Sequence, residues 1–215
     1  MAEKKREALD LKNEIIMYSI SKRLFDLIFS LVGLFILLPL FILIATLIIV
    51  TSGLPVFYTQ NRVGRANVDF KLLKFRTMKN NADKLGLLTI GGRDPRVTNI
   101  GYYLRKYKLD ELPQLLNVFI GTMSLVGPRP EVRKYVNLYN EKQKKILLVK
   151  PGITDYASLA YFSENELLAK SQNPELTYIK EVMPAKLELN KKYISEMGVF
   201  TDLKIIFKTF KRIIS

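Results

Sequence analysis

The sequence predicts an α+β protein that is predominantly helical, with an N-terminal membrane helix and a small β-hairpin. Three patterns support this prediction: an uncharged apolar run at 27–50, two short aromatic and β-branched stretches after it, and amphipathic segments through the rest of the chain. We expect four parts. They are an amphipathic lead-in (1–22), a re-entrant membrane helix (23–51), a cytoplasmic domain with amphipathic surface helices (52–200) and a C-terminal amphipathic helix (201–215).

The run at 27–50 is long enough to cross a bilayer, but its flanks favour another path. As one helix it would be about 36 Å long, against a hydrocarbon core of roughly 30 Å. Basic residues flank the run on both sides, and such residues stay on the cytoplasmic side. Pro39 removes a helix hydrogen bond and kinks the helix. We therefore expect a re-entrant helix that enters the inner leaflet and returns, with a single span as the alternative.

Asp26 begins this apolar segment, beside Lys22 and Arg23. A carboxylate inside hydrocarbon is costly. We therefore expect Asp26 to pair with these two cations at the membrane interface.

The amino-acid composition restricts the binding partners, catalytic groups and metals that the protein can use. The net charge is +14, from 34 basic and 20 acidic residues. The expected counter-charges are anionic inner-membrane lipids and a phosphorylated substrate; nucleic acid is not expected, because no nucleic-acid-binding motif accompanies the basic residues.

The chain has no cysteine and no histidine, which excludes disulfides, His-ligated zinc and Ser-His-Asp or Cys-His catalysis. Carboxylates, Lys, Tyr and hydroxyls remain as nucleophiles, with Mg²⁺ as the natural metal.

Secondary structure after residue 52 begins with two strand-like stretches, 55–59 and 68–78, separated by a turn that contains Gly64. They predict a β-hairpin. Helical segments follow, interrupted by turns rich in Gly and Pro. We expect helices at 100–107, 109–120, 131–148 and, with breaks at Pro174 and Pro184, 161–197.

The tail at 201–215 has an apolar face and a basic face. The apolar face is formed by Leu203, Ile206, Phe207, Phe210, Ile213 and Ile214. The basic face is formed by Lys204, Lys208, Lys211 and Arg212. Two interpretations stay open: a helix lying on an anionic bilayer surface, and a terminal helix packed on the domain core with its basic face in solvent.

The first candidate site is the carboxylate pair Asp110–Glu111, followed by Pro113. Proline is tolerated only in the first turn of a helix, so we expect a helix to start near 108–110. One interpretation makes Asp110 a helix N-cap. The other places a carboxylate and Mg²⁺ beside a phosphate at a helix N-terminus, where a carboxylate can also accept a phosphoryl group.

The second candidate is the turn 127–131, in which Pro128 and Pro130 stiffen the backbone on either side of Arg129. A guanidinium presented in this way suits bidentate binding of phosphate oxygens, although a solvated turn is the alternative. A third set of basic residues, interleaved with aromatics, fits a phosphate pocket or a lipid-facing surface. These residues are Lys74, Arg76, Arg96 and Arg105.

The order of the motifs resembles the bacterial sugar transferases, which are small monotopic phosphoglycosyl transferases. The resemblance covers about residues 20–160, and the tail at 201–215 also resembles the family's C-terminal amphipathic helix. In chain order the motifs are Lys-Arg-Leu-Phe-Asp (22–26), a proline-broken apolar helix, Phe-Tyr-Thr-Gln-Asn-Arg-Val-Gly (57–64), Lys-Phe-Arg-Thr-Met (74–78), Leu-Asp-Glu-Leu-Pro-Gln (109–114), Met-Ser-Leu-Val-Gly-Pro-Arg-Pro (123–130) and Lys-Pro-Gly-Ile-Thr (150–154).

The resemblance implies that 52–200 is a catalytic domain that moves a sugar-1-phosphate from a UDP-sugar to undecaprenyl phosphate and releases UMP. Asp110 would be the nucleophile that forms a phosphosugar-aspartate, and Glu111 would help with Mg²⁺ or orientation, so that both are expected metal ligands. Arg129, Arg105 and Lys74 or Arg76 would bind phosphates. The implied location is the cytoplasmic face of the inner membrane, at the start of surface glycan assembly; a homodimer is an allowed assembly.

The chain departs from the family pattern at three places. Thr122 replaces the usual aspartate, Leu38 replaces the serine often found before the helix-breaking proline, and 155–158 differs from the usual Gly-Trp-Ala-Gln. The last region is expected to line the sugar or uridine pocket, so the sugar stays open. A rival from another class is a non-catalytic basic adaptor that recruits partners to anionic lipid.

Overall fold

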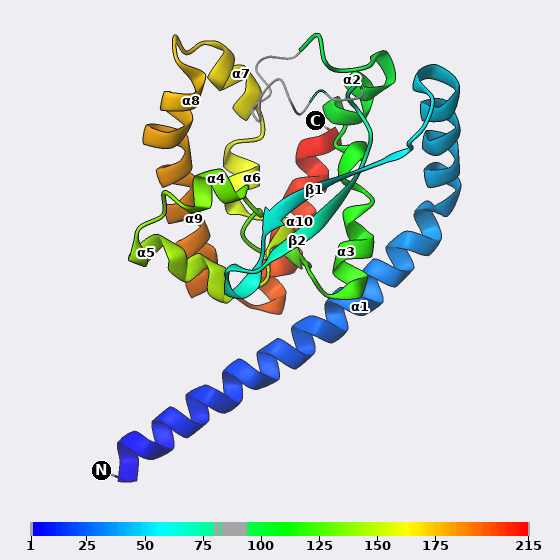
Figure 1. Ribbon diagram of the computed structural model, residues 1–215. Coiled ribbons are helices and arrows are strands. Elements are labelled where there is room, and N and C mark those ends of the chain that lie inside the picture. The colour runs from blue at the N-terminus through cyan, green and yellow to red at the C-terminus, as the bar shows by residue number, and fades with distance from the viewer. Residues whose placement is uncertain (1, 80–81, 83–93, 215) are drawn as a thin grey trace.

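The computed structural model describes residues 2–79, 82 and 94–214 (Figure 1). A single long helix, α1 (Ala2–Ser52), leads into a mainly helical domain. Within α1, the part Ile20–Ser52 is long and apolar enough to cross a membrane by length and composition. The helix continues through residue 22, and the boundary expected there between a lead-in and a membrane helix stays a prediction. The side chains of residues 2–19 lie outside the description, and with them the amphipathic character expected for 1–22.

Pro39 lies inside α1 without ending it. Figure 1 shows the helix changing direction in its C-terminal part without folding back on itself. A missing backbone N–H inside a helix is a common cause of such a bend. The re-entrant path through a bilayer stays a prediction.

Polar side chains fix α1 to the domain. The carboxylate of Asp26 accepts hydrogen bonds from Ser124 Oγ and Leu125 N, both at 3.0 Å. The guanidinium of Arg23 donates to the carbonyls of Val118 and Phe119, each at 2.7 Å. The expectation that Asp26 pairs with Lys22 and Arg23 is therefore wrong.

Lys22 and Arg23 instead bind groups of the domain, which the fold places within hydrogen-bonding distance of them. Lys22 forms an ion pair with Asp202, with its Nζ 2.5 Å from Oδ2. The guanidinium of Arg23 lies at the C-terminal end of helix α3 (Gln114–Ile120), where backbone carbonyls without a helical partner attract a cation. Asp26 can then be buried against the domain instead of remaining at an interface with solvent.

The predicted hairpin is confirmed. Strands β1 (Phe57–Val63) and β2 (Asp69–Phe75) pair antiparallel, with Phe57 opposite Phe75 and Val63 opposite Asp69. The side chain of Asn117 fastens β2 to helix α3, because its Oδ1 accepts from Leu73 N at 2.9 Å and its Nδ2 donates to Lys71 O at 2.8 Å.

The segment after the hairpin forms α2 (Asn99–Lys106), a 3-10 turn η3 (Leu109–Glu111) and α3 (Gln114–Ile120). The helix at 100–107 is confirmed. The helix expected to start near 108–110 begins later, because Pro113 occupies the cap position of α3 and Asp110 and Glu111 lie in the preceding turn. No side-chain cap bond is made there, so the N-cap interpretation of Asp110 is wrong.

A parallel pair of short strands, β3 (Ser124–Val126) and β4 (Gly152–Thr154), was not predicted. The two strands approach so closely that a Cβ on Gly152 would lie 2.0 Å from Gly127 N. Only glycine permits this contact, which holds the turn 127–131 against β4.

The remaining helices cover the other side of the domain (Figure 1). The expected helix at 131–148 is broken into short pieces, and Pro184 does not interrupt the helical path, because a π-helical segment precedes it and Pro184 fits the first turn of the helix that follows. Within 131–148 the structure has α4 (Arg133–Val136), α5 (Glu141–Lys144) and η4 (Lys145–Leu148). The helical elements that follow are α6 (Tyr156–Ala160), α7 (Glu164–Ala169), α8 (Pro174–Thr177), η5 (Tyr178–Val182) and α9 (Met183–Ser195).

The last helix, α10 (Val199–Ile214), packs on the domain, as one of the two interpretations of the tail expects. Ile205 is fully buried in a cluster with Val126 and Tyr193, so one face packs on the domain. Phe207 and Phe210 are exposed apolar residues on the same helix, at 71% and 63% of their surface. Exposed aromatic rings beside basic residues are typical of a helix at a membrane surface, and this placement stays a prediction.

Candidate active site

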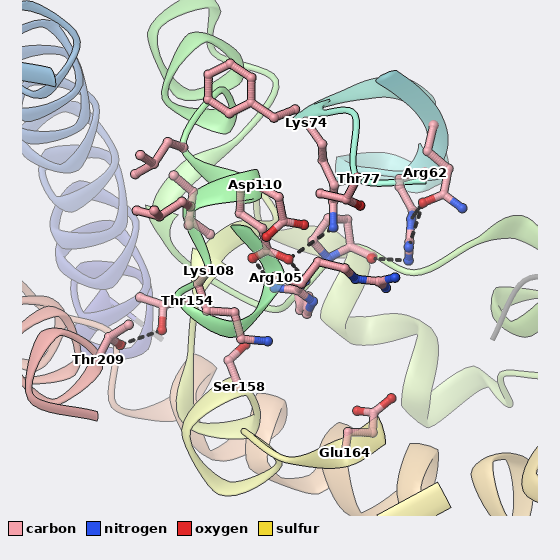
Figure 2. A pocket seen from close by; sticks show the side chains of 18 of the residues that line it. Arg62, Lys74, Thr77, Arg105, Lys108, Asp110, Thr154, Ser158, Glu164 and Thr209 are labelled. Carbon is pink, nitrogen blue, oxygen red and sulfur yellow. Dashed lines mark hydrogen bonds and ion pairs between the residues drawn. The ribbon is translucent and has the colours of Figure 1, made fainter. Parts of the chain in front are cut away.

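A cavity of about 780 Å³ lies where α1, η3, α6 and α10 meet. Figure 2 shows Asp110 in the middle of it, with Lys74, Arg105 and Lys108 nearby and Glu164 across the cavity. The lining combines two kinds of side chain: charged residues, among them those of η3, and leucine and isoleucine residues of α1 and α10.

The 3-10 turn η3 brings two consecutive carboxylates into this cavity. Lys108, just before it, has a left-handed backbone with φ of 57°, a conformation that is rare for residues other than glycine and is often found at functional sites. Asp110 and Glu111 are both buried. Their environments nevertheless differ sharply.

Glu111 is held by two cations. Arg129 donates from both Nη atoms, with Nη1 3.0 Å from Oε2 and Nη2 bonded to Oε1. Lys74 Nζ donates to Oε1 at 3.0 Å. Burial alone would raise the pKa of Glu111, but the charges of Arg129 and Lys74 hold it well below its ordinary value. Glu111 is therefore an ionised carboxylate fixed in position.

Asp110 makes no hydrogen bond or ion pair within the described part of the chain. Burial raises the pKa of its carboxyl; Lys74 opposes the rise and the neighbouring Glu111 adds to it. A buried carboxylate without a fixed partner is energetically unfavourable. It is also a carboxylate whose oxygens remain available to a ligand.

The turn around Arg129 is held in place because several of its backbone groups have partners. Gly152 N donates to the carbonyl of Pro128 at 3.0 Å, and Arg62 Nη1 donates to the carbonyl of Pro130 at 3.0 Å. The amide of Arg129 donates to Asp155 Oδ2 at 3.2 Å. The attraction of Glu111 raises the pKa of Arg129, so this guanidinium stays charged.

The basic residues singled out in the sequence separate into two groups. Lys74, Arg105 and Arg129 border the carboxylate pair, and burial lowers the pKa of both Lys74 and Arg105. Arg96 instead pairs with Asp94, with Nη2 2.6 Å from Oδ2.

Arg76 also lines the cavity, and its expected role as a phosphate ligand stays a prediction. Its side chain is buried, and its guanidinium donates to the carbonyls of Ser52, Gly53 and Leu54 at 2.8, 2.5 and 2.9 Å. Backbone carbonyls at a helix end need such donors. Arg76 therefore fastens the end of α1.

Sequence reasoning missed two residues of the site. Asp155 was noted only as part of a variable stretch, yet it fixes both Arg129 N and, at 2.6 Å from Oδ1, Ser158 N. Lys108, two residues before Asp110, lines the cavity. This closeness to the carboxylate pair was the available signal; nothing local in the sequence indicates the contact of Asp155.

The carboxylates can be tested as metal ligands. No group of three His, Cys, Asp or Glu side chains capable of holding a metal occurs among residues 2–79, 82 and 94–214. Mg²⁺ is commonly bound by one or two carboxylates together with substrate phosphates. The donor set fits such a shared site through Asp110, because both oxygens of Glu111 are already bound by Arg129 and Lys74.

The fold and the site together define a class of protein: a domain that carries a helix long and apolar enough to cross a membrane and a buried carboxylate in a cavity lined by cations. Comparison with known proteins identifies the family. The model of the bacterial sugar transferase family matches residues 17–215, and the chain belongs to this family. The resemblance found in the ordered motifs is therefore confirmed.

Several curated relatives are similar along most of this chain. The UDP-N-acetylgalactosamine-undecaprenyl-phosphate N-acetylgalactosaminephosphotransferase of Aeromonas hydrophila is 34% identical over 202 residues, which cover 93% of this chain and 45% of the relative. The UDP-glucose:undecaprenyl-phosphate glucose-1-phosphate transferase of Escherichia coli (strain K12) is 34% identical, over 87% of this chain and 39% of the relative. This chain thus spans less than half of either protein.

A relative of similar length is the uncharacterized sugar transferase EpsL of Bacillus subtilis (strain 168). It is 36% identical over 195 residues, which cover 91% of this chain and 88% of the relative. The part of the longer relatives that this chain matches therefore also occurs in a chain of about its own length.

Proposed function

We propose that this protein transfers a sugar-1-phosphate from a UDP-sugar to undecaprenyl phosphate and releases UMP, at the cytoplasmic face of the inner membrane, as the first membrane step of surface glycan assembly. The names of the Aeromonas and Escherichia relatives support both substrates. The apolar helix α1 supports the membrane location. The expected lack of nucleic-acid binding and the homodimer remain predictions.

One observation carries the mechanism: of two adjacent buried carboxylates, Glu111 is bound by two cations and Asp110 is not. A carboxylate oxygen with a free lone pair can act as a nucleophile. An oxygen of Asp110 attacks the β-phosphorus of the UDP-sugar, the bond from that phosphorus to the bridging oxygen breaks, and UMP leaves with the electron pair. The sugar-1-phosphate is then held as an acyl phosphate ester of Asp110.

The acceptor completes the cycle. An anionic oxygen of undecaprenyl phosphate attacks the same phosphorus, and the bond to Asp110 breaks to regenerate the carboxylate. Because the attacking oxygen is already deprotonated, the step needs no histidine base, which suits a chain without histidine. Two displacements at one carboxylate predict ping-pong kinetics.

The neighbouring residues supply orientation and charge. Lys74 and Arg129, fixed by Glu111, lie beside the reacting phosphoryl group and stabilise negative charge that builds on its oxygens. Arg105 adds a third positive charge on the cavity wall. Asp110 would hold Mg²⁺, which would supply positive charge to stabilise the leaving UMP.

The experiment is a panel of UDP-sugars, supplied with Mg²⁺ to the full chain in lipid nanodiscs, with and without undecaprenyl phosphate. We expect multiple turnovers of UMP release with one or a few sugars, and only when the acceptor is present. A basic membrane adaptor would release no UMP with any donor. Donor-independent lipid binding alone would therefore contradict the proposal.

A further inference from the structure

A second group of polar side chains lines the cavity besides the carboxylate pair. Glu164, in the first turn of α7, forms an ion pair with Lys186 of α9, with Nζ 2.7 Å from Oε2. Asn190 lies one turn further along α9, so it shares a face of that helix with Lys186. Ser158 of α6 completes what we call the Glu164 group. All four residues line the same cavity as Asp110, and Figure 2 shows Ser158 and Glu164 there.

Two members of the group have polar atoms without a hydrogen-bond partner. Asn190 is 4% exposed, and neither its Oδ1 nor the Oγ of Ser158 bonds to any group in the described part of the chain. Most buried polar atoms in folded proteins are hydrogen-bonded, so an unpaired one calls for a water or a ligand. An amide oxygen only accepts, whereas a serine hydroxyl both donates and accepts. Asn190 therefore needs a donor such as a hydroxyl group.

The ion pair also has unused hydrogen-bonding capacity. Among the described residues, neither Glu164 Oε1 nor the remaining N–H groups of Lys186 have a hydrogen-bond partner. The Lys186 ammonium lies 5.4 Å from the centroid of the Tyr178 ring, and the hydroxyl of Tyr178 donates to Glu131, so the pair is held in position. It presents an acceptor next to a donor. Two neighbouring hydroxyl groups, each of which donates and accepts, match this arrangement.

The charge of the group selects the kind of ligand. Glu164 and Lys186 neutralise each other, and Asn190 and Ser158 carry no charge. In the cavity as a whole, by contrast, the lining cations outnumber the lining carboxylates. A diphosphate matches that excess of positive charge. A neutral ligand with several hydroxyl groups matches the Glu164 group.

The position of the group points to one part of the donor. The negative charge of Glu111 raises the pKa of Arg129, and the charge of Glu164 adds to this rise. Glu164 is therefore within electrostatic reach of the guanidinium that holds Glu111 beside Asp110. In a UDP-sugar the sugar is joined directly to the β-phosphate, whereas the uridine is separated from it by the α-phosphate. With the β-phosphate at Asp110, the sugar is the part that fits beside Arg129.

We propose that the Glu164 group binds the sugar ring of the UDP-sugar donor and determines which sugar is accepted. This inference rests on the proposed function. Glu164 and Lys186 bind two neighbouring ring hydroxyls, and Asn190 accepts from a third. A site that hydrogen-bonds a substrate hydroxyl rejects an analogue without it, because buried polar groups are then left unpaired. The uracil base, which also offers a donor and two acceptors, is the competing occupant.

The kinetic test combines changes in the protein with changes in the sugar. The donor with the highest turnover is compared with its monodeoxy analogues, each of which lacks one ring hydroxyl. For at least one analogue the wild type should lose about tenfold or more in kcat/KM. Asn190→Leu should lose a similar factor with the parent donor and no longer discriminate against that analogue. Glu164→Gln, whose amide oxygen still accepts from Lys186, should behave in the same way for another hydroxyl.

The same variants separate binding from folding. Asn190→Leu removes an acceptor that has no partner within the described residues, so it should leave the Tm unchanged or raise it. Asn137→Leu and Glu141→Gln make the same changes at exposed positions and serve as matched controls. Neither control should alter the discrimination between the donor and its analogues.

A binding test does not depend on turnover. UMP, UDP-glucose, UDP-galactose and UDP-N-acetylgalactosamine are titrated into full-length Asp110→Asn protein in nanodiscs, which lacks the proposed nucleophile. The affinities for the three UDP-sugars should span about tenfold or more. This span should disappear when Glu164→Gln and Asn190→Leu are added, whereas the affinity for UMP should not change.

The outcomes separate the two proposals. Additive losses for each variant with every analogue would overturn the inference, as would equal wild-type affinities for the three UDP-sugars. A fall in UMP affinity as large as the fall in donor affinity would assign the group to the uridine instead. A lower Tm in Asn190→Leu with unchanged discrimination would assign it to the fold. If the wild type releases no UMP with any donor, the proposed function fails, and the binding test still decides whether the group recognises the sugar.

Discussion

Two buried aspartates lie in different regions of the molecule and have opposite surroundings. Asp26, where α1 joins the domain, is 2% exposed and its carboxylate accepts hydrogen bonds from Ser124 and Leu125. Asp110, in the cavity, is 6% exposed and has no such partner within the described residues. Burial alone does not distinguish a structural carboxylate from a candidate catalytic one. The difference is whether the fold provides hydrogen-bond donors to the carboxylate oxygens or leaves these oxygens available to a ligand.

The comparison extends to the neighbouring cations. In the part of α1 around Asp26, Lys22 pairs with Asp202 of α10 and Arg23 donates to backbone carbonyls of α3. Each charge therefore stabilises a contact between α1 and another helix. Around Asp110, the cations either fix Glu111 or border the cavity. The first region joins α1 to the domain; in the second, the carboxylate of Asp110 has no hydrogen bond or ion pair among the described residues.

The largest expected effect is on catalysis. Asp110→Asn removes the proposed nucleophile and should lower UMP turnover by at least about a thousandfold, whereas Asp26→Asn, which keeps an acceptor oxygen for Ser124 and Leu125, should leave the turnover of the folded protein within about threefold. Both are measured as UMP release per folded molecule. Equal losses in the two variants would remove the distinction between the two regions.

The next effect is on stability. Asp26→Ala leaves the Ser124 hydroxyl and the Leu125 amide without their acceptor, which costs about 1–3 kcal/mol, and should lower the Tm by several degrees in a thermal melt. Asp110→Ala removes no hydrogen bond. Its Tm should stay at or above that of the wild type, and a Tm below that of Asp26→Ala would contradict the comparison.

A dependence on pH sharpens the contrast. Burial raises the pKa of Asp110 above 3.8, so the ionised form destabilises the folded state at neutral pH. Without divalent cations, Asp110→Asn should therefore raise the Tm at pH 7 by about 2–4 °C, the shift for about 1 kcal/mol. The gain should vanish as the pH falls through the raised pKa of Asp110. A gain that persists in acid would assign the effect to something other than this ionisation.

Glu111 titrates in the opposite direction. Although burial opposes it, Arg129 and Lys74 hold its pKa well below 4.5. Its contribution to stability is therefore complete above its unfolded pKa and is lost as the pH falls toward the lowered value. In Glu111→Gln the Tm should depend less on pH below about pH 5 than in the wild type. A steeper acid dependence in that variant would contradict the ion pairs.

The smallest expected effect concerns the geometry of the guanidinium. Arg129→Lys keeps the charge but cannot bind both oxygens of Glu111, so we expect a fall in kcat of about tenfold. Arg133→Lys, at an exposed ion pair with Asp69, is the matched control and should have no effect. The measurement is the ratio of the two kcat values under saturating substrates.

The sequence predicted what local patterns encode. The hairpin and the helix after residue 98 follow from alternation and periodicity, and the carboxylate pair and the Pro-Arg-Pro turn are contiguous motifs. The strands β3 and β4 were missed because three-residue strands carry almost no periodic signal and pair across a long connection. The roles of Arg76 and Asp155 were missed for a related reason: each depends on backbone groups distant in the chain.

The most direct test of the proposed covalent intermediate is intact and peptide mass spectrometry of the full chain incubated with UDP-sugar and Mg²⁺ but no acceptor. We predict one added sugar phosphate per chain, located on Asp110, formed together with one equivalent of UMP and removed by undecaprenyl phosphate. An unmodified Asp110 in a preparation that turns over with both substrates, or an adduct on another residue, would contradict the claim that this carboxylate carries the sugar phosphate.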